Sequence, residues 1–201
     1  RSTLSSSSAA SDVYKRQVRA ELESSVADAD ELLLTFASLL RIARIESGTY
    51  SPTLEKIDLS VILADAADLY QGVADERNVV LVSDTDPNLV VQGDRNLMFQ
   101  AISNLLDNAV KNSPSGGAVG LVATKENNEV RLKIYDSGPG IPEEEYDRVL
   151  ERFSRLDQSR SLPGSGLGLS VVKAVIELHR GTLIFRNNDP GLMVELKFPL
   201  N

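Results

Sequence analysis

The chain has 201 residues, of which 42% are hydrophobic, so it can form one domain of medium size with its own core and a helical extension. Its net charge of −8 argues against a nucleic-acid-binding surface, which needs clustered Lys and Arg. Cysteine is absent, which excludes disulfides and thiolate metal sites, and no apolar run approaches the roughly 20 residues of a membrane-spanning helix.

Residues 1–17 differ in composition from the rest of the chain. The stretch from Leu4 to Ser11 consists mostly of Ser and Ala and has no hydrophobic periodicity. Such a segment cannot bury a core. We expect a disordered or artefactual leader that resembles a cloning or sequencing scar, with a natural flexible linker as the alternative.

A helix is predicted from residue 18 onward. Its apolar residues recur in steps of four and three, which is typical of the seam of a coiled coil or four-helix bundle. This apolar stripe consists of Leu22, Val26, Ala29, Leu33, Phe36, Leu40 and Ala43. Gly48 and Pro52 predict the end of the helix. The alternative is an ordinary amphipathic helix packed on its own domain.

Beyond residue 52, helical and strand patterns are mixed. Asp58 and Asp94 are predicted N-caps of two helices, which reach about residue 77 and residue 112. A third helix is expected after Gly168. Strands are predicted at residues 53–57, 79–82, 118–124, 130–135, 182–186 and 193–198, with a hairpin at Asn127–Asn128. The mixture predicts an α+β fold, a two-layer sandwich with a mostly antiparallel mixed sheet covered by helices, and not a doubly wound parallel sheet.

Four short motifs follow one another along this region. The first places Asn104, Asn108 and Lys111 on one helix face, because residues three and four apart are neighbours there. The others are the turn from Asp136 to Gly140, the pair Arg152-Phe153, and the glycine-rich stretch 164–169. Each motif is weak alone. Together, at these spacings, they resemble the N, G1, F and G2 boxes of the sensor histidine kinase ATP-binding domain, which has the Bergerat fold of the gyrase, ATP-dependent chaperone and mismatch-repair ATPases.

The resemblance implies ATP and Mg²⁺ as cofactors. Mg²⁺ prefers octahedral oxygen ligands, and Asn108 would be its protein ligand. Asn104 would orient water or phosphate oxygens, and Lys111 would offer a positive charge to a phosphate. Hydrolytic relatives typically carry a Glu at position 104, and Asn cannot accept a proton, so phosphoryl transfer is favoured over fast hydrolysis. The alternative for this face is a solvated polar surface.

The second motif would bind the base. The Asp136 carboxylate can accept a hydrogen bond from the exocyclic amine of adenine and would face acceptor against acceptor with guanine. Gly138 and Gly140 would let the backbone approach the ring, and Ile141 leads out of the turn.

Residues 142–163 resemble the family's ATP lid. Arg152 and Phe153 would provide a mobile cation and an apolar anchor. Leu150 stands where the family usually has a Phe. A solvated charged loop is the alternative for the lid arginines, which also include Arg155 and Arg160.

The glycine-rich stretch opens a predicted helix, whose free backbone N–H groups form an anion site. Its expected nucleotide-binding residues are Gly164, Gly166, Leu167, Gly168 and Leu169. The stretch is neither a Walker A loop nor a Rossmann fingerprint.

His179 is the chain's one histidine. We expect a structural role at a helix-to-strand junction, because the phosphoacceptor motif of the family would precede the helix with the apolar stripe. That motif is absent, so the chain as written is not expected to autophosphorylate.

The resemblance divides the chain into a leader (1–17), a partial dimerisation helix (18–49) and an ATP-binding catalytic domain (50–201). It implies transfer of the γ-phosphoryl group to a histidine outside this sequence and then to a response regulator, with homodimerisation through the heptad helix. A cytoplasmic location is expected, either as a soluble kinase or as the cytoplasmic part of a membrane-bound sensor. The alternatives are a serine kinase of the anti-sigma type and a nucleotide-sensing module without catalysis.

Overall fold

The computed structural model describes residues 18–19, 22, 26, 29, 32–33, 35–45, 47–49, 54–155 and 165–200. The chain divides into two compact units, Arg1–Leu40 and Arg41–Asn201. The expected leader, residues 1–17, lies outside the described residues. The division into a dimerisation helix at 18–49 and a catalytic domain at 50–201 stays a prediction.

The first unit carries the predicted helix. Its described residues are helical, and the large apolar members of the stripe are exposed. Phe36, for example, is 60% exposed. The N-terminal helix is thus confirmed, while its role in dimerisation stays a prediction.

The second unit begins with the end of this helical stretch. Ile42 is buried, and Ile45 packs against the hydrophobic core of the domain. Gly48 has a positive φ of 66°, and its N–H donates to the carbonyl of Ile45. This geometry fits the expected helix end, because glycine adopts positive φ without steric cost.

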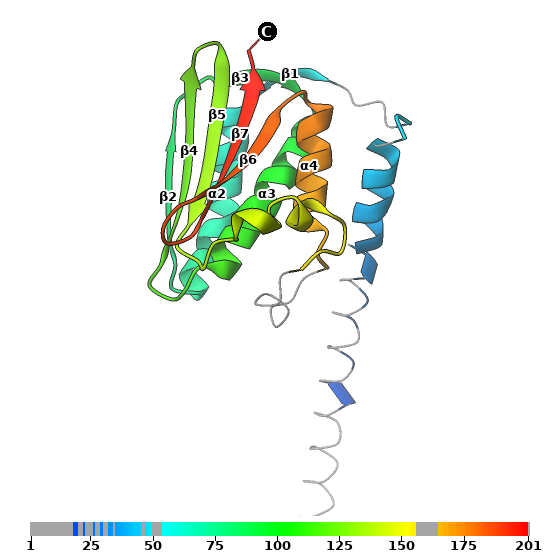
Figure 1. Cartoon of the computed structure of the whole chain (residues 1–201), viewed down its shortest axis with the longest axis vertical. Coiled ribbons are helices and arrows are strands. Elements are labelled where there is room, and N and C mark those ends of the chain that lie inside the picture. Colours follow the sequence, from blue (N-terminus) through cyan, green and yellow to red (C-terminus); the bar gives the residue numbers. More distant parts are fainter. Residues whose placement is uncertain are drawn as a thin grey trace, which may run out of the picture. The chain divides into compact units, whose positions relative to one another are not determined.

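A five-stranded sheet forms one layer of the domain (Figure 1). Its strands, in spatial order, are β2 (Val80–Thr85), β4 (Ala118–Glu126), β5 (Glu129–Asp136), β7 (Leu192–Pro199) and β6 (Thr182–Asn187). Only β2 and β4 are parallel, so the predicted mixed, mostly antiparallel sheet is confirmed. A separate two-stranded sheet pairs β1 (Glu55–Asp58) with β3 (Val90–Gly93), a strand that the sequence pattern did not predict.

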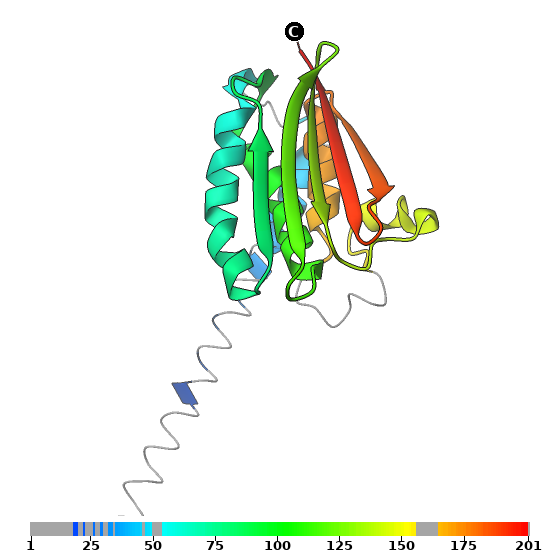
Figure 2. The ribbon, with the colours of Figure 1, turned by 90° about the vertical axis from the view of Figure 1, so that its left-hand side faces the viewer.

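Three helices form the other layer: α2 (Leu59–Glu76), α3 (Arg95–Asn112) and α4 (Gly168–Leu178). Figure 2 looks onto the sheet, with α3 and α4 behind the strands. Asp58 accepts a hydrogen bond from the Ser60 N–H, and Asp94 accepts from two N–H groups of the first turn of α3. Both predicted N-caps are confirmed. Between β5 and α4 lie two short 3-10 helices, η1 (Glu143–Glu145) and η2 (Arg148–Leu150).

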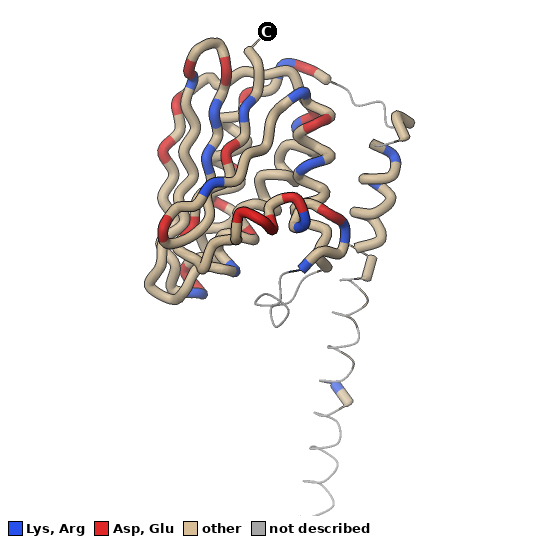
Figure 3. Tube along the Cα trace, viewed as in Figure 1, with Lys and Arg blue, Asp and Glu red and all other residues tan. Residues whose placement is uncertain are grey.

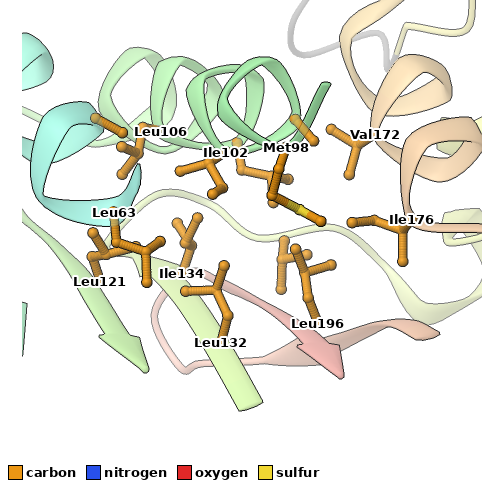
Figure 4. Packing of buried hydrophobic residues seen from close by; sticks show 14 of the residues in the cluster. Leu63, Met98, Ile102, Leu106, Leu121, Leu132, Ile134, Val172, Ile176 and Leu196 are labelled. Carbon is orange, nitrogen blue, oxygen red and sulfur yellow. The ribbon is translucent and has the colours of Figure 1, made fainter. Parts of the chain in front are cut away.

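The core lies between the layers. Met98 and Ile102 of α3 pack toward Leu132 and Leu196 of the sheet (Figure 4). Burial of such a side chain contributes about 1.5–3 kcal/mol to the free energy of folding, so the packing of the two layers stabilises the domain. The residues of β5 alternate strictly between buried and half-buried positions, and the buried series ends with Asp136. The pleat of the strand therefore points this carboxylate inward.

Among the described residues, no helix combines the length and the apolar character needed to cross a membrane.

Candidate functional site

Two segments far apart in sequence, the start of α4 and the turn after β5, lie against α3. The side-chain amide of Asn104 donates to the carbonyl of Gly168, the first residue of α4, at 3.3 Å. At the C-terminal end of α3, the carbonyl of Asn112 lies so close to Gly138 that a Cβ there would approach it to 2.7 Å. The predicted polar face of α3 therefore contacts the start of α4, and the backbone at the end of α3 contacts the turn after β5.

Asn108 lies one turn after Asn104 and also faces α4. Its Nδ2 would be 3.8 Å from a Cβ on Gly168, an ordinary contact distance. Its backbone carbonyl accepts a hydrogen bond from the Asn112 side chain at 2.8 Å. Within the described residues, no three His, Cys, Asp or Glu side chains gather as a metal site. A metal ligated here by Asn108 would take its other ligands from a bound molecule or water.

Lys111 follows on the same face, but its charge already has a partner. Its Nζ lies 2.6 Å from the carboxylate of Asp107, and both side chains are about one-third exposed. An anion that bound Lys111 would share it with Asp107.

Asp136 is the buried carboxylate of the site, with 7% of its surface exposed. Its Oδ1 accepts two backbone N–H groups, from Gly138 at 2.7 Å and from Leu192 at 3.3 Å. Burial raises the pKa of Asp136, while these two hydrogen bonds oppose the rise. No bond to Oδ2 is found in the described part of the chain, which leaves this oxygen as an acceptor.

The turn after Asp136 requires its glycines. Gly140 has a φ of +72°, and a Cβ there would lie 3.0 Å from the carbonyl oxygen of Gly191. A Cβ on Gly138 would lie 2.8 Å from Asp136 Oδ1. Ile141 then packs partly buried against the core and anchors the exit from the turn.

The start of α4 exposes backbone donors. Its N-cap residue is Leu167, which is buried and has no hydrogen-bonding side chain that could cap the helix. The first N–H groups of α4 therefore have no side-chain cap from this residue, and the predicted anion site at the positive dipole end of the helix stays a prediction. Leu169 packs partly buried against the core. Gly164, which was predicted to take part, lies outside the described residues.

Comparisons with known proteins show the family of the domain. Residues 93–201 match the family described as histidine kinase-, DNA gyrase B-, and HSP90-like ATPase. The chain belongs to this family. Its ATP-binding domain is a catalytic domain homologous to those of sensor histidine kinases, and it has their Bergerat fold.

The individual relatives are sensor kinases. SenX3 of Mycolicibacterium smegmatis is 32% identical over 168 residues, which cover 83% of this chain and 44% of SenX3. The solved structure of the mycobacterial sensor histidine kinase MprB is 34% identical, with a TM-score of 0.65, and the match covers 73% of this chain and 97% of that one. Full-length ShkA in complex with AMPPNP, at 24% identity and a TM-score of 0.74, shares the fold over 85% of this chain and 36% of its own. The chain spans less than half the length of the first curated relatives that it matches.

In this histidine kinase catalytic domain, the described part of the expected lid is residues 142–155. Acidic and basic residues follow one another along it (Figure 3). Val149 is buried and Leu150 packs partly against the core, so Leu serves as an apolar anchor where the family usually has Phe. Phe153 is 58% exposed and has a φ of +61°, which is uncommon for a bulky residue.

Among the described residues, the lid segment lies against the glycine-rich stretch at Gly166. Gly166 has a φ of +71°, and a Cβ there would lie 3.0 Å from the backbone of Phe153. The predicted F and G2 boxes are therefore neighbours in space. Arg152 lies next to this contact in sequence.

His179 caps the far end of α4. Its Nε2 accepts the backbone N–H of Asp94 at 2.9 Å, and its Nδ1 lies 2.6 Å from the carbonyl of Val175. These partners require a neutral ring with the proton on Nδ1. Burial lowers the pKa of His179, although hydrogen bonding to Val175 and the charge of Asp94 oppose the shift. The ring joins the end of α4 to the N-cap of α3. His179 lies between α4 and β6, at the helix-to-strand junction that the sequence predicts.

Sequence reasoning missed the loop between β6 and β7. Asn188 donates to the carbonyl of Asp136, and Leu192 donates to its carboxylate. The motif Asn-Asn-Asp-Pro-Gly at residues 187–191 predicts a turn, but nothing in it indicates contact with a residue 52 positions earlier.

Proposed function

We propose that the domain binds ATP with Mg²⁺ and transfers the γ-phosphoryl group to a histidine on a dimerisation domain, from which it passes to a response regulator. The observation that supports this most strongly is the contact of the Asn104 and Asn108 face with Gly168. It brings the candidate metal ligand to the candidate phosphate site, while Asp136 lies buried in the turn that contacts the C-terminal end of the same helix.

The adenine ring would lie at the turn after β5. Asp136 Oδ2 would accept the exocyclic amine, because Oδ1 is occupied by two backbone donors. Gly138 and Gly140 would allow close approach of the ring. A buried carboxylate with one open oxygen fits adenine, whose amine is a donor at that position.

The phosphates would lie at the start of α4. The N–H groups of Gly168 and Leu169 would receive phosphate oxygens, with Gly166 and Leu167 shaping the loop before them. Asn108 would hold Mg²⁺, which when bound neutralises charge on the phosphates. Asn104 cannot take a proton, so water attack would be slow. Arg152 and Phe153 would cover the phosphates together with Gly164, and Lys111 would add charge.

The phosphoacceptor would belong to another segment or molecule. His179, the one histidine of the chain, is 6% exposed and uses both ring nitrogens in hydrogen bonds. The exposed apolar stripe of the N-terminal helix favours homodimerisation, because a stripe of this kind is buried in coiled coils and four-helix bundles.

Incubation with γ-labelled ATP tests the proposal. We expect the chain alone to remain unlabelled and an added dimerisation domain of a sensor kinase to acquire an acid-labile label. Acid-labile label on this chain that disappears in His179→Ala would make His179 the acceptor. Acid-stable label on a serine of a partner would indicate the anti-sigma type of kinase, and ATP binding without any transfer would indicate a nucleotide-sensing module.

A further inference from the structure

The loop between β6 and β7 lies directly against the turn that carries Asp136. The side-chain amide of Asn188 donates to the Asp136 carbonyl at 3.0 Å, and the N–H of Leu192 donates to Oδ1 at 3.3 Å. A Cβ on Gly191 would stand only 1.8 Å from the Asp136 carbonyl oxygen. The loop therefore holds both the backbone and the carboxylate of Asp136.

Gly191 is packed from two sides. Its φ of +115° and its approach to Asp136 exclude a side chain, and its own carbonyl lies against Gly140 at the end of the same turn. The loop also stabilises its own shape, because the Asn188 N–H donates to the Gly191 carbonyl at 3.0 Å. The loop can therefore hold Asp136 in a fixed position.

The loop between β6 and β7 determines which oxygen of the Asp136 carboxylate is available to a ligand. Gly138 from the turn and Leu192 from the loop both donate to Oδ1, so the plane of the carboxylate is fixed by donors from two segments. Oδ2 is left to accept a bond from a ligand. Release of the loop would remove one donor and let the carboxylate rotate away from that orientation.

We propose that Asn188 and Gly191 are positioning residues for adenine recognition: they orient the Asp136 carboxylate and thereby set the preference for adenine over guanine. This inference rests on the proposed function, in which Asp136 accepts the adenine amine.

Asn188→Ala tests the inference, with Asn128→Ala as a matched control. Asn128 makes the same type of bond, from its side-chain amide to the carbonyl of Leu200 at 3.1 Å, at the opposite end of β5. Competition of ATP and GTP against a ribose-labelled adenine nucleotide measures both affinities. We expect Asn188→Ala to lose ATP affinity about two- to ten-fold, the value of one hydrogen bond, with little change for GTP. The ratio of ATP to GTP affinity then falls by the same factor, and Asn128→Ala keeps it.

Two further variants sharpen the result. Asn188→Asp keeps the size of the side chain but cannot donate when ionised, so it should behave like Asn188→Ala. Gly191→Ala should show a larger loss, with folding checked by circular dichroism. In all three variants, release of the loop should weaken the hydrogen bond from Leu192, which lowers the pKa of Asp136. The pKa of Asp136 should therefore rise, and ATP affinity should be lost at a higher pH on acidification.

Failure of this inference differs from failure of the proposed function. If Asp136→Asn leaves ATP binding unchanged, Asp136 is not the adenine residue and both are wrong. If Asp136→Asn weakens ATP binding while Asn188→Ala retains the ATP to GTP ratio of Asn128→Ala, only the positioning role is overturned. Equal losses for ATP and GTP in Asn188→Ala would also overturn it.

Discussion

The two ends of the candidate nucleotide site are built in different ways. At the adenine end, Asp136 is 7% exposed and receives backbone donors from two segments. Of the residues proposed to contact the phosphates, Lys111 is one-third exposed and Phe153 is 58% exposed. The adenine end is thus fixed by packing and buried hydrogen bonds, whereas the phosphate end offers charges and backbone dipoles near solvent. Such a difference suits a rigid selector for the base beside groups that adjust to phosphates and metal.

This difference predicts that substitutions at the two ends change ATP binding with a different dependence on Mg²⁺. Changes at the adenine end should weaken ATP binding with or without Mg²⁺. Changes at the phosphate end should act mainly when Mg²⁺ is present.

The largest effect is expected for Asp136→Asn. The amide can present a donor to the adenine amine, and a charge-assisted hydrogen bond is lost, so we expect a decrease in ATP affinity of about ten- to a hundred-fold. Calorimetric titration with ATP, in the presence of Mg²⁺ and of a chelator, measures it. Asp65→Asn is a matched control, because Asp65 is half-exposed and forms a surface ion pair with Arg95. Similar ATP affinity in both variants would contradict the adenine assignment.

Asn108→Ala should have a smaller and conditional effect. Loss of the metal ligand should weaken Mg²⁺-dependent ATP binding about ten-fold and leave binding in a chelator unchanged. The comparison of the two titrations isolates the metal contribution. Asn96→Ala, an exposed position in the first turn of the same helix, is the control. An equal loss with and without Mg²⁺ would show that Asn108 acts on the nucleotide or on helix packing instead.

The smallest effect on nucleotide binding is expected for His179→Ala, at the end of α4 remote from Gly168. This variant leaves the half-buried N–H of Asp94 without its His179 acceptor, so the free energy of unfolding should fall by about 1–3 kcal/mol while ATP affinity stays close to that of the wild type. Urea denaturation and calorimetry measure the two quantities. A large loss of ATP affinity in a folded variant would place His179 in the nucleotide site.

His179 also predicts a pH dependence of stability. Burial lowers its pKa in the folded state, so below about pH 6.5 the unfolded chain binds the proton more readily than the folded one. The contribution of the neutral ring to stability is therefore complete above that pH and is lost as the pH falls toward the folded-state pKa. Urea denaturation at about pH 7.5 and about pH 5.5 should show a smaller decrease for His179→Ala than for the wild type. An equal decrease would assign the pH dependence to other groups.

Much of the fold could be predicted from the sequence, because capping residues and turn residues close to each element determine where helices and hairpins begin. Asp58 and Asp94 cap their helices as expected, since a short acceptor side chain satisfies the first N–H groups. Asn127 and Asn128 both have positive φ, as the hairpin prediction requires. The short strand β3 was missed, because its pairing with β1 depends on contacts between segments that are separated by a whole helix.

In the candidate site, the sequence predicted only the residues that belong to recognisable motifs. Asn104 and Gly168 carry recognisable spacing, and the structure joins them. The pairing of Lys111 with Asp107 was not anticipated, although the spacing of four residues on a helix allows it. The contact of Asn188 with Asp136 has no local signature, because it arises only when β5 and β7 pair in the sheet.

The most direct test of the central claim, a rigid adenine end joined to a metal-dependent phosphate end, is competition between ATP and GTP for the wild-type chain with Mg²⁺ and with a chelator. Guanine would leave Asp136 facing another acceptor, and an unsatisfied buried polar group costs about 1–3 kcal/mol. The account predicts that ATP binds roughly ten- to a hundred-fold more tightly than GTP, that both affinities fall when Mg²⁺ is removed, and that their ratio is unchanged. Equal affinity of ATP and GTP, or a ratio that disappears together with Mg²⁺, would contradict it.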